Sequence, residues 1–119
     1  MADFKKLKVW QKAHALALGT HEMAGKIRGA GNMSLKSQMI RAAMSIDSNI
    51  VEGRGKNSDK EFARYLRTAL NSASELESHF IMASDLGIIA TKDFATKVDQ
   101  TIEVRKMLHG LIDRIGGDS

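Results

Sequence analysis

The sequence predicts an all-α protein, an antiparallel up-down-up-down four-helix bundle. The 119-residue chain has no proline and only 5% aromatic residues, whereas strands are enriched in aromatic and β-branched residues. Alanine, leucine, methionine, lysine and glutamate, which favour helix, are abundant. Apolar residues recur at spacings of three and four between short glycine-dense breaks. Short connections make successive long helices antiparallel neighbours, which gives the bundle.

The first helix is expected at about residues 3–28. A second apolar row, Val9, Leu16 and Met23, lies at heptad spacing beside its main face and widens that face beyond what three partner helices need. We therefore expect self-association, with a monomer that tolerates exposed apolar residues as the open alternative. The main face is predicted to carry Phe4, Leu7, Trp10, Ala13, Ala17, Ala24 and Ile27.

The second helix, at about residues 34–53, follows the break at residues 29–32 and carries two parallel stripes. The apolar stripe points to the core and consists of Leu35, Met39, Ala42, Ile46 and Ile50. The polar stripe beside it consists of Gln38, Arg41, Ser45, either Ser48 or Asn49, and Glu52.

The polar stripe mixes amide, guanidinium, hydroxyl and carboxylate groups, which suits a buried or half-buried seam. An antiparallel connection at residues 53–57 brings Arg41 opposite the third helix, where we expect a charge-assisted bond to Glu75. A solvated face is the alternative, and the seam could lie within the bundle or between subunits. The predicted structural polar seam is Gln38, Arg41, Ser45, Asn49, Glu52, Ser72 and Glu75.

The third and fourth helices are expected at about residues 58–86 and 91–115, in a single domain that spans residues 1–119. Ser58-Asp-Lys-Glu61 is a capping box that opens the third helix, and Gly87 is placed to end it. Its inward residues are predicted to be Phe62, Tyr65, Ala69, Ala73, Leu76, Phe80 and Ala83. Those of the fourth are predicted to be Phe94, Val98, Ile102, Leu108, Leu111 and Ile115.

The composition favours a cytoplasmic location. The chain contains no cysteine, so it has no disulfide framework and no thiolate metal site. Polar residues such as His14 and Glu22 interrupt the apolar stretch that follows the first lysines, which argues against a signal peptide or a membrane span.

Positive charge is concentrated in the first part of the chain. Residues 1–67 hold thirteen lysines and arginines against six acidic residues, whereas residues 68–119 hold five against eight. Antiparallel topology places the start of the first helix, the connection between the second and third, and the end of the fourth at one end of the molecule. The candidate nucleic-acid-binding residues there are Lys5, Lys6, Lys8, Lys12, Arg54, Lys56, Lys60, Arg64 and Arg67, which Arg105, Lys106 and Arg114 join.

Such a basic end attracts phosphate backbones, with affinity that depends on salt. Solvated lysines are the simpler explanation of these counts, because only Tyr65 offers an aromatic ring nearby and no recognised nucleic-acid-binding motif is present. Base-specific readout is therefore the weaker expectation.

Enzymatic motifs are incomplete in this chain. His21 and Glu22 begin a metalloprotease pattern, but Gly25 stands where the second histidine must be. Glu75 and His79 are one residue too far apart for the motif of di-iron bundles. His14 and His21 lie on one face two turns apart, too distant to share an ion without a third ligand, and His109 stands alone. We therefore expect no catalytic residues, no metal and no cofactor.

Three segments together resemble a known bacterial family, the four-helix bundle proteins related to those encoded in intervening sequences of 23S ribosomal RNA genes. The first segment carries Phe4, Leu7, Val9, Trp10 and Ala13, and the second carries Gln38, Arg41, Ala42, Ser45, Ile46, Asn49, Ile50, Glu52 and Gly53. The third carries Phe62, Leu66, Ala69, Ser72, Glu75, Leu76 and Glu77. The chain departs from the family where Asp47 replaces a usual proline, where Asn71 replaces a usual glycine, and in lacking a proline before the second helix.

The resemblance implies a left-turning four-helix bundle that assembles as a homopentamer. It also implies a distant likeness to the accessory variability proteins of diversity-generating retroelements, which bind nucleic acid beside a reverse transcriptase. The resulting hypothesis is a non-enzymatic, homo-oligomeric protein that binds RNA or DNA through its basic end and does not enter membranes. A protein-protein scaffold without nucleic-acid binding is the alternative.

Overall fold

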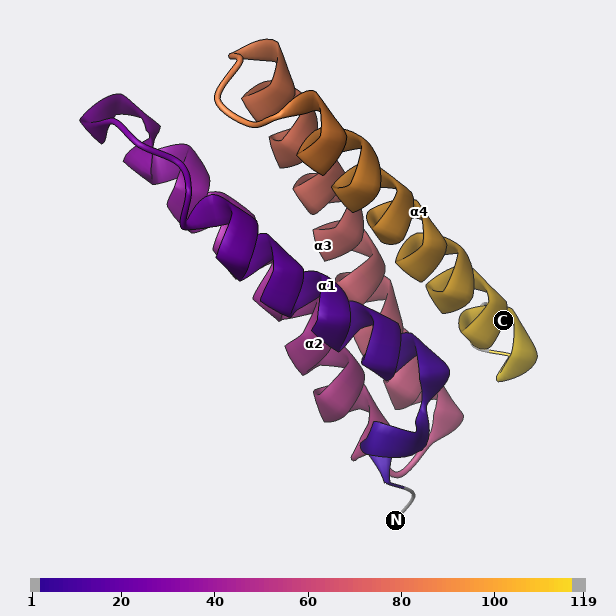
Figure 1. Ribbon diagram of the computed structural model, residues 1–119. Coiled ribbons are helices and arrows are strands. Elements are labelled where there is room, and N and C mark those ends of the chain that lie inside the picture. Colours follow the sequence, from indigo (N-terminus) through magenta and orange to yellow (C-terminus); the bar gives the residue numbers. More distant parts are fainter. Residues whose placement is uncertain (1–2, 117–119) are drawn as a thin grey trace.

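Four long helices form the molecule, and a computed structural model describes residues 3–116 (Figure 1). Within these residues there is no strand, and the prediction of an all-α four-helix bundle is confirmed. The short 3-10 helices are η1 (Phe4–Lys6) and η2 (Ala30–Asn32). The long helices are α1 (Lys8–Ala24), α2 (Met33–Arg54), α3 (Asp59–Asp85) and α4 (Thr91–Arg114).

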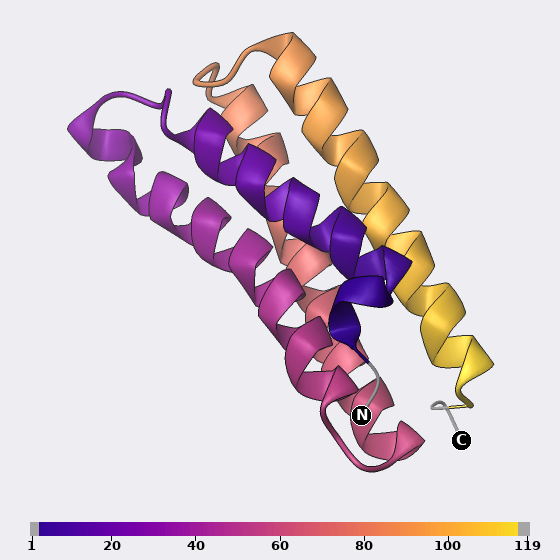
Figure 2. The same ribbon diagram turned by 60° about the horizontal axis from the view of Figure 1, so that its bottom comes forward.

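The helices run side by side in an elongated bundle of 45 × 20 × 19 Å. Contacts join α1 to α2, α2 to α3, α3 to α4 and α4 back to α1, so each helix has two neighbours around the core. Two views show η1, the connection between α2 and α3, and the last turn of α4 at the same end (Figures 1 and 2). The expected antiparallel arrangement therefore brings these three segments together.

The predicted capping box opens α3. The Ser58 side-chain oxygen accepts a hydrogen bond from the Glu61 backbone N–H at 3.2 Å, which satisfies one of the donors that a helix start leaves free. At the other end, Gly87 has φ +71°, and the Ile88 N–H bonds to the Ala83 carbonyl at 3.1 Å. The left-handed conformation of Gly87 and the hydrogen bond from Ile88 back to Ala83 form a Schellman motif, which ends the helix as expected.

The first helix is shorter than predicted. Instead of one helix over residues 3–28, η1 is followed by Leu7 in an extended conformation (φ −74°, ψ 124°), and α1 runs only from Lys8 to Ala24. The Asp3 carboxylate accepts from the Lys5 N–H at 3.0 Å and closes a separate turn. The Gln11 side chain then bonds to the Lys5 carbonyl at 2.9 Å and fixes that turn against α1.

The inward face of α1 also differs from the prediction. Val9, Leu16 and Met23 are buried in the core, at 4%, 1% and 4% exposure, so they are not a surplus apolar row and give no argument for self-association. Thr20 belongs to the same buried stripe, with 0% exposure. Because threonine is polar, the hydrophobic pattern of the sequence did not indicate that this face of α1 points to the core. The predicted inward residues Phe4, Leu7, Trp10 and Ala17 are only partly buried.

The core otherwise follows the predicted periodicity in α2 and α3, and a glycine sets their closest approach. A Cβ atom at Gly53 would lie 2.8 Å from the Tyr65 Cβ and 2.9 Å from Phe62 Cδ1, closer than real Cβ contacts. Glycine is therefore required where α2 meets α3 beside their connection. In the described residues, no helix combines the length and apolar character needed to cross a membrane.

Candidate nucleic-acid interface

The basic end of the bundle is formed by segments that are far apart in sequence. Figure 2 shows that η1, the start of α1, the α2–α3 connection and the end of α4 lie at one end of the bundle. Each of these segments carries lysines or arginines. The helices hold them there because each helix reverses the direction of the one before it. The cations differ, however, in what else they contact.

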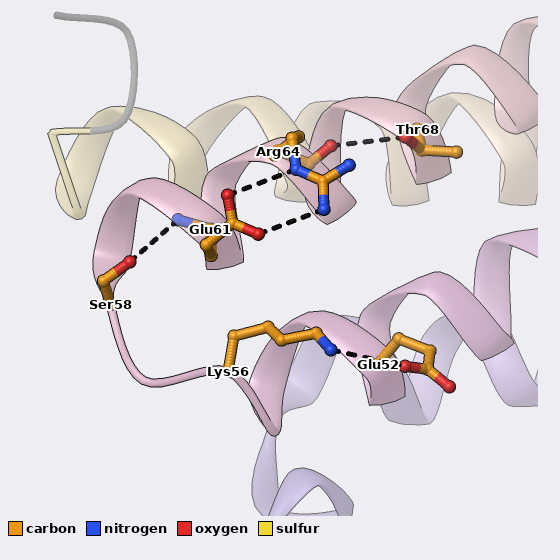
Figure 3. Close-up of polar contacts among 6 residues, drawn as sticks. All are labelled: Glu52, Lys56, Ser58, Glu61, Arg64 and Thr68. Atoms are coloured by element: carbon orange, nitrogen blue, oxygen red, sulfur yellow. Dashed lines mark hydrogen bonds and ion pairs between the residues drawn. The ribbon is translucent and has the colours of Figure 1, made fainter.

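Around the α2–α3 connection, the cations are paired with carboxylates (Figure 3). Lys56 Nζ lies 3.9 Å from Glu52 Oε2, and both residues are on the surface. Arg64 donates two bonds to Glu61, from Nη2 to Oε1 at 3.0 Å and from Nε to Oε2 at 3.3 Å. The hydrogen bond from Arg64, followed by its charge, lowers the pKa of Glu61 below its usual value.

The same cations lie against aromatic rings. Lys56 Nζ is 5.2 Å and Arg64 Cζ is 4.6 Å from the centre of the Tyr65 ring. A base that stacks on Tyr65 therefore competes with two cations for the ring. Arg54 is half-buried, with Cζ 5.6 Å from the centre of the Phe62 ring, so it also serves the local packing.

Two further cations form ion pairs between helices. Lys12 Nζ lies 3.6 Å from Glu103 Oε1 and joins α1 to α4. Arg105 Nη1 donates to Glu77 Oε1 and joins α4 to α3 in a half-buried position. Such pairs place charge at the right end of the molecule but leave less of it available to a ligand.

A pocket of about 470 Å³ separates the start of α1 from the last turns of α4. Four cations line it, Lys6 and Lys8 from one side and Lys106 and Arg114 from the other. In the part of the chain that the structure describes, none of these four has an ion-pair partner, and no acidic side chain lines the pocket. The sequence placed these cations at the basic end, but it gave no sign of the pocket, which depends on Gly110 in α4.

The inner part of the predicted polar seam is assembled between α2 and α3. The hydroxyl oxygens of Ser45 and Ser72 are 2.8 Å apart, and Ser72 is 9% exposed. The Asn49 amide donates to the Ser45 carbonyl at 2.8 Å and to its hydroxyl at 3.1 Å. These three side chains satisfy one another inside the helix pair, as a half-buried seam requires.

The outer part of the seam is solvent-exposed, and the predicted Arg41–Glu75 bond is wrong for the single chain. Among residues 3–116, no ion pair joins Arg41 to Glu75, although both border a shallow pocket of about 290 Å³ with Gln38. All three are exposed, and exposed charges gain little from pairing because water solvates them and long side chains lose freedom. Glu52 instead faces Lys56 in its own helix.

A contact that the sequence did not predict is centred on Asp47. Its carboxylate accepts from the Trp10 indole N–H at 2.7 Å, and its other oxygen lies 2.7 Å from His14 Nδ1. The Trp10 and His14 rings are stacked with centres 4.7 Å apart, and Phe4 meets Trp10 edge-on at 5.1 Å. Asp47 lies on neither stripe of α2, which is why stripe analysis missed it, and it ties α1 to an unbroken α2.

The remaining histidines and carboxylates form no candidate metal site in the described part of the chain. Within residues 3–116, no group of three or more histidine, cysteine, aspartate or glutamate side chains is arranged to hold a metal ion. His21 borders a pocket of about 220 Å³ with His14 and Asp47, and exposed Leu18 and Met44 also line it. This mostly apolar hollow lies between α1 and α2, away from the basic pocket.

Comparisons with known proteins identify a family through a family model and support the fold through a solved structure. Residues 5–110 match the family model for the 23S rRNA-intervening sequence protein. The chain is also similar to a protein of unknown function from the S23 ribosomal protein family of Bacteroides thetaiotaomicron VPI-5482, known from a crystal structure. The TM-score is 0.80 at 21% sequence identity, over 87% of this chain and 97% of the other, which supports the shared fold alone. No curated protein matches.

Proposed function

Since the chain belongs to the family of 23S rRNA-intervening sequence proteins, we propose that it is a non-enzymatic protein of the cytoplasm that binds RNA or DNA through its basic end and works as a homo-oligomer. The pentameric state is the one that the family resemblance implies. The observation that carries the proposal is the gathering of cations from η1, α1, the α2–α3 connection and α4 at one end of the bundle.

Electrostatics support binding to a polyanion. The net charge is +4 with an isoelectric point near 9.5, and the basic end concentrates much of that charge. Phosphate backbones bind such surfaces through release of counterions, without a need for base contacts. The candidate contact residues are Lys5, Lys6, Lys8, Lys12, Arg54, Lys56, Lys60, Arg64 and Arg67.

Exposed side chains on α2 support self-association. Met33 and Met44 are 53% and 58% exposed, and Met44 borders a shallow pocket beside Arg41 and Ile40. Apolar groups next to unpaired polar groups are typical of an interface core with a polar rim. In a ring of parallel copies, the basic ends would lie on one face and add their fields.

A salt titration tests the binding proposal. Fluorescence anisotropy with labelled RNA and DNA should give affinities that fall as salt rises, with a logarithmic slope of about 0.7 to 0.9 for each phosphate contact. The variant Lys8→Ala/Lys60→Ala should weaken binding. The matched control Lys26→Ala/Lys92→Ala removes the same charge from the opposite end and should bind like the wild type.

The scaffold alternative makes a different forecast. A protein that only joins other proteins would show a flat titration at low salt, and that result would reject nucleic-acid binding. Light scattering tests assembly separately, because a pentamer has about five times the 13.1 kDa mass of one chain. A single-chain mass at working concentrations would reject the homo-oligomer.

A further inference from the structure

We propose that the pocket between the start of α1 and the end of α4 binds the terminal phosphate of a nucleic-acid strand. This inference rests on the proposed function and names the part of the ligand that the basic end recognises. Lys6, Lys8, Lys106 and Arg114 line the pocket and would face that phosphate.

Charge favours a terminal over an internal phosphate. A phosphate monoester carries about −1.5 to −2 charges at pH 7 and offers three acceptor oxygens, whereas each internal phosphodiester carries one charge. Four cations with no ion-pair partner among residues 3–116 suit the more highly charged group. The guanidinium of Arg114 adds a planar set of donors that matches two phosphate oxygens.

The start of α1 strengthens the same site. Leu7 precedes the helix and supplies no side-chain cap, so the first N–H groups of α1 have no partner from a capping side chain. Lys8 and Val9 belong to this first turn, and both line the pocket. The positive end of the helix dipole favours an anion near the start of α1, beside these cations.

The size and walls of the pocket fit the last nucleotide of a strand. Its volume of about 470 Å³ lies within the range of ordinary small-molecule sites. Leu7, Met107 and Leu111 supply apolar wall beside the cations, against which a ribose or base can lie. Gly110 keeps the α4 side open, because a Cβ atom there would meet nothing within 4 Å.

The other cations of the basic end have a different part in this arrangement. Arg64, Lys56 and Lys12 are engaged with carboxylates and can give a following strand only weaker, exchangeable contacts. The pocket is therefore where a ligand finds several unengaged cations at once. A strand end anchored there would run along the paired cations without any need to read its bases.

The test compares RNAs of one sequence that differ only at their ends, with a 5′-phosphate, a 3′-phosphate or two hydroxyls. Anisotropy titrations of the full chain should give about tenfold tighter binding to one phosphorylated RNA than to the hydroxyl-ended RNA. The identity of the tighter RNA reports which end enters. Lys106→Ala should reduce the preference, because it removes one of the four cations.

A second variant separates the pocket from general charge. Gly110→Leu keeps every cation and fills the open side, and leucine favours helix more than glycine does, so circular dichroism should show a folded bundle. It should abolish the end preference, whereas hydroxyl-ended RNA should still bind with salt-dependent affinity through the retained cations. The matched control is Gly31→Leu in η2, where a Cβ also meets nothing within 4 Å and the pocket is far away.

The outcomes distinguish this inference from the proposed function. Equal binding of all three RNAs, or a preference that survives Gly110→Leu, would overturn the terminal-phosphate site and leave nucleic-acid binding in place. Failure of every RNA to bind at low salt would overturn both.

Discussion

Two regions of the basic end carry similar charge but differ in how much of it a ligand can use. Around the α2–α3 connection, Lys56 and Arg64 are bound to carboxylates and lie against Tyr65. In the pocket between α1 and α4, Lys106 and Arg114 have no such partner among the described residues. A count of lysines and arginines thus overstates the usable charge of one region and not of the other.

The difference arises from helical spacing. Glu52 and Lys56 are four residues apart, and Glu61 and Arg64 are three apart, so each pair meets on one helix surface. Lys106 also has a carboxylate one turn away, at Glu103, but that carboxylate pairs with Lys12 of α1. A contact between helices therefore removes the local partner and leaves Lys106 unengaged.

The largest expected effect comes from breaking the α2–α3 region itself. Gly53→Ala places a Cβ atom within 3 Å of Tyr65 and Phe62, and we expect the free energy of unfolding to fall by about 1–3 kcal/mol because the helices must separate. Urea denaturation measures the loss. The folded fraction should still prefer a phosphorylated RNA end, since the pocket belongs to α1 and α4. An unchanged unfolding midpoint would show that the close approach is not rigid.

The next effect compares the two regions directly. Lys106→Ala/Arg114→Ala and Lys56→Ala/Arg64→Ala remove the same number of charges from the same end of the molecule. We expect about tenfold weaker RNA binding for the pocket variant and less than about threefold for the other, whose cations are already engaged. Anisotropy at one low salt concentration measures both. Equal losses would mean that pairing does not limit availability.

A smaller effect should appear when a paired cation is released. Glu61→Gln removes the carboxylate that holds Arg64, and RNA affinity should rise slightly, by about twofold. Asp59→Asn, in the same first turn of α3, removes one negative charge without freeing Arg64 and serves as the control. A rise of equal size in both variants would attribute the effect to net charge alone.

The smallest effect concerns pH. Arg64 lowers the pKa of Glu61 in the folded chain, so the pair contributes stability above the usual pKa of 4.5, and this contribution is lost as pH falls through the lowered value. An NMR titration of the Glu61 carboxyl should give a midpoint below 4.5, and Arg64→Ala should raise it, because Arg64 is the largest cause of the lowered pKa. A midpoint at or above 4.5 in the wild type would contradict the bond.

The bundle was predictable because its helices are strongly amphipathic and their breaks are clear. The inward face of α1 was not predictable, because Thr20 is polar but occupies a buried position in that face. The gathering of cations at one end followed from topology. The pairing of these cations could not be predicted, because it depends on contacts between helices, such as that of Lys12 with Glu103. The pocket could not be predicted either, because it lies between two helices and is lined by Gly110, which has no side chain.

The contact of Trp10 with Asp47 makes tryptophan fluorescence a probe of the packing of α1 against α2. Trp10 is the only tryptophan of the chain, and its indole is held between α1 and α2 by the Asp47 carboxylate and the His14 ring. Separation of α1 from α2 would break the indole's hydrogen bond to Asp47 and expose the ring to water, so its emission should shift to longer wavelength. Undocking of the first helix is therefore observable without any attached dye.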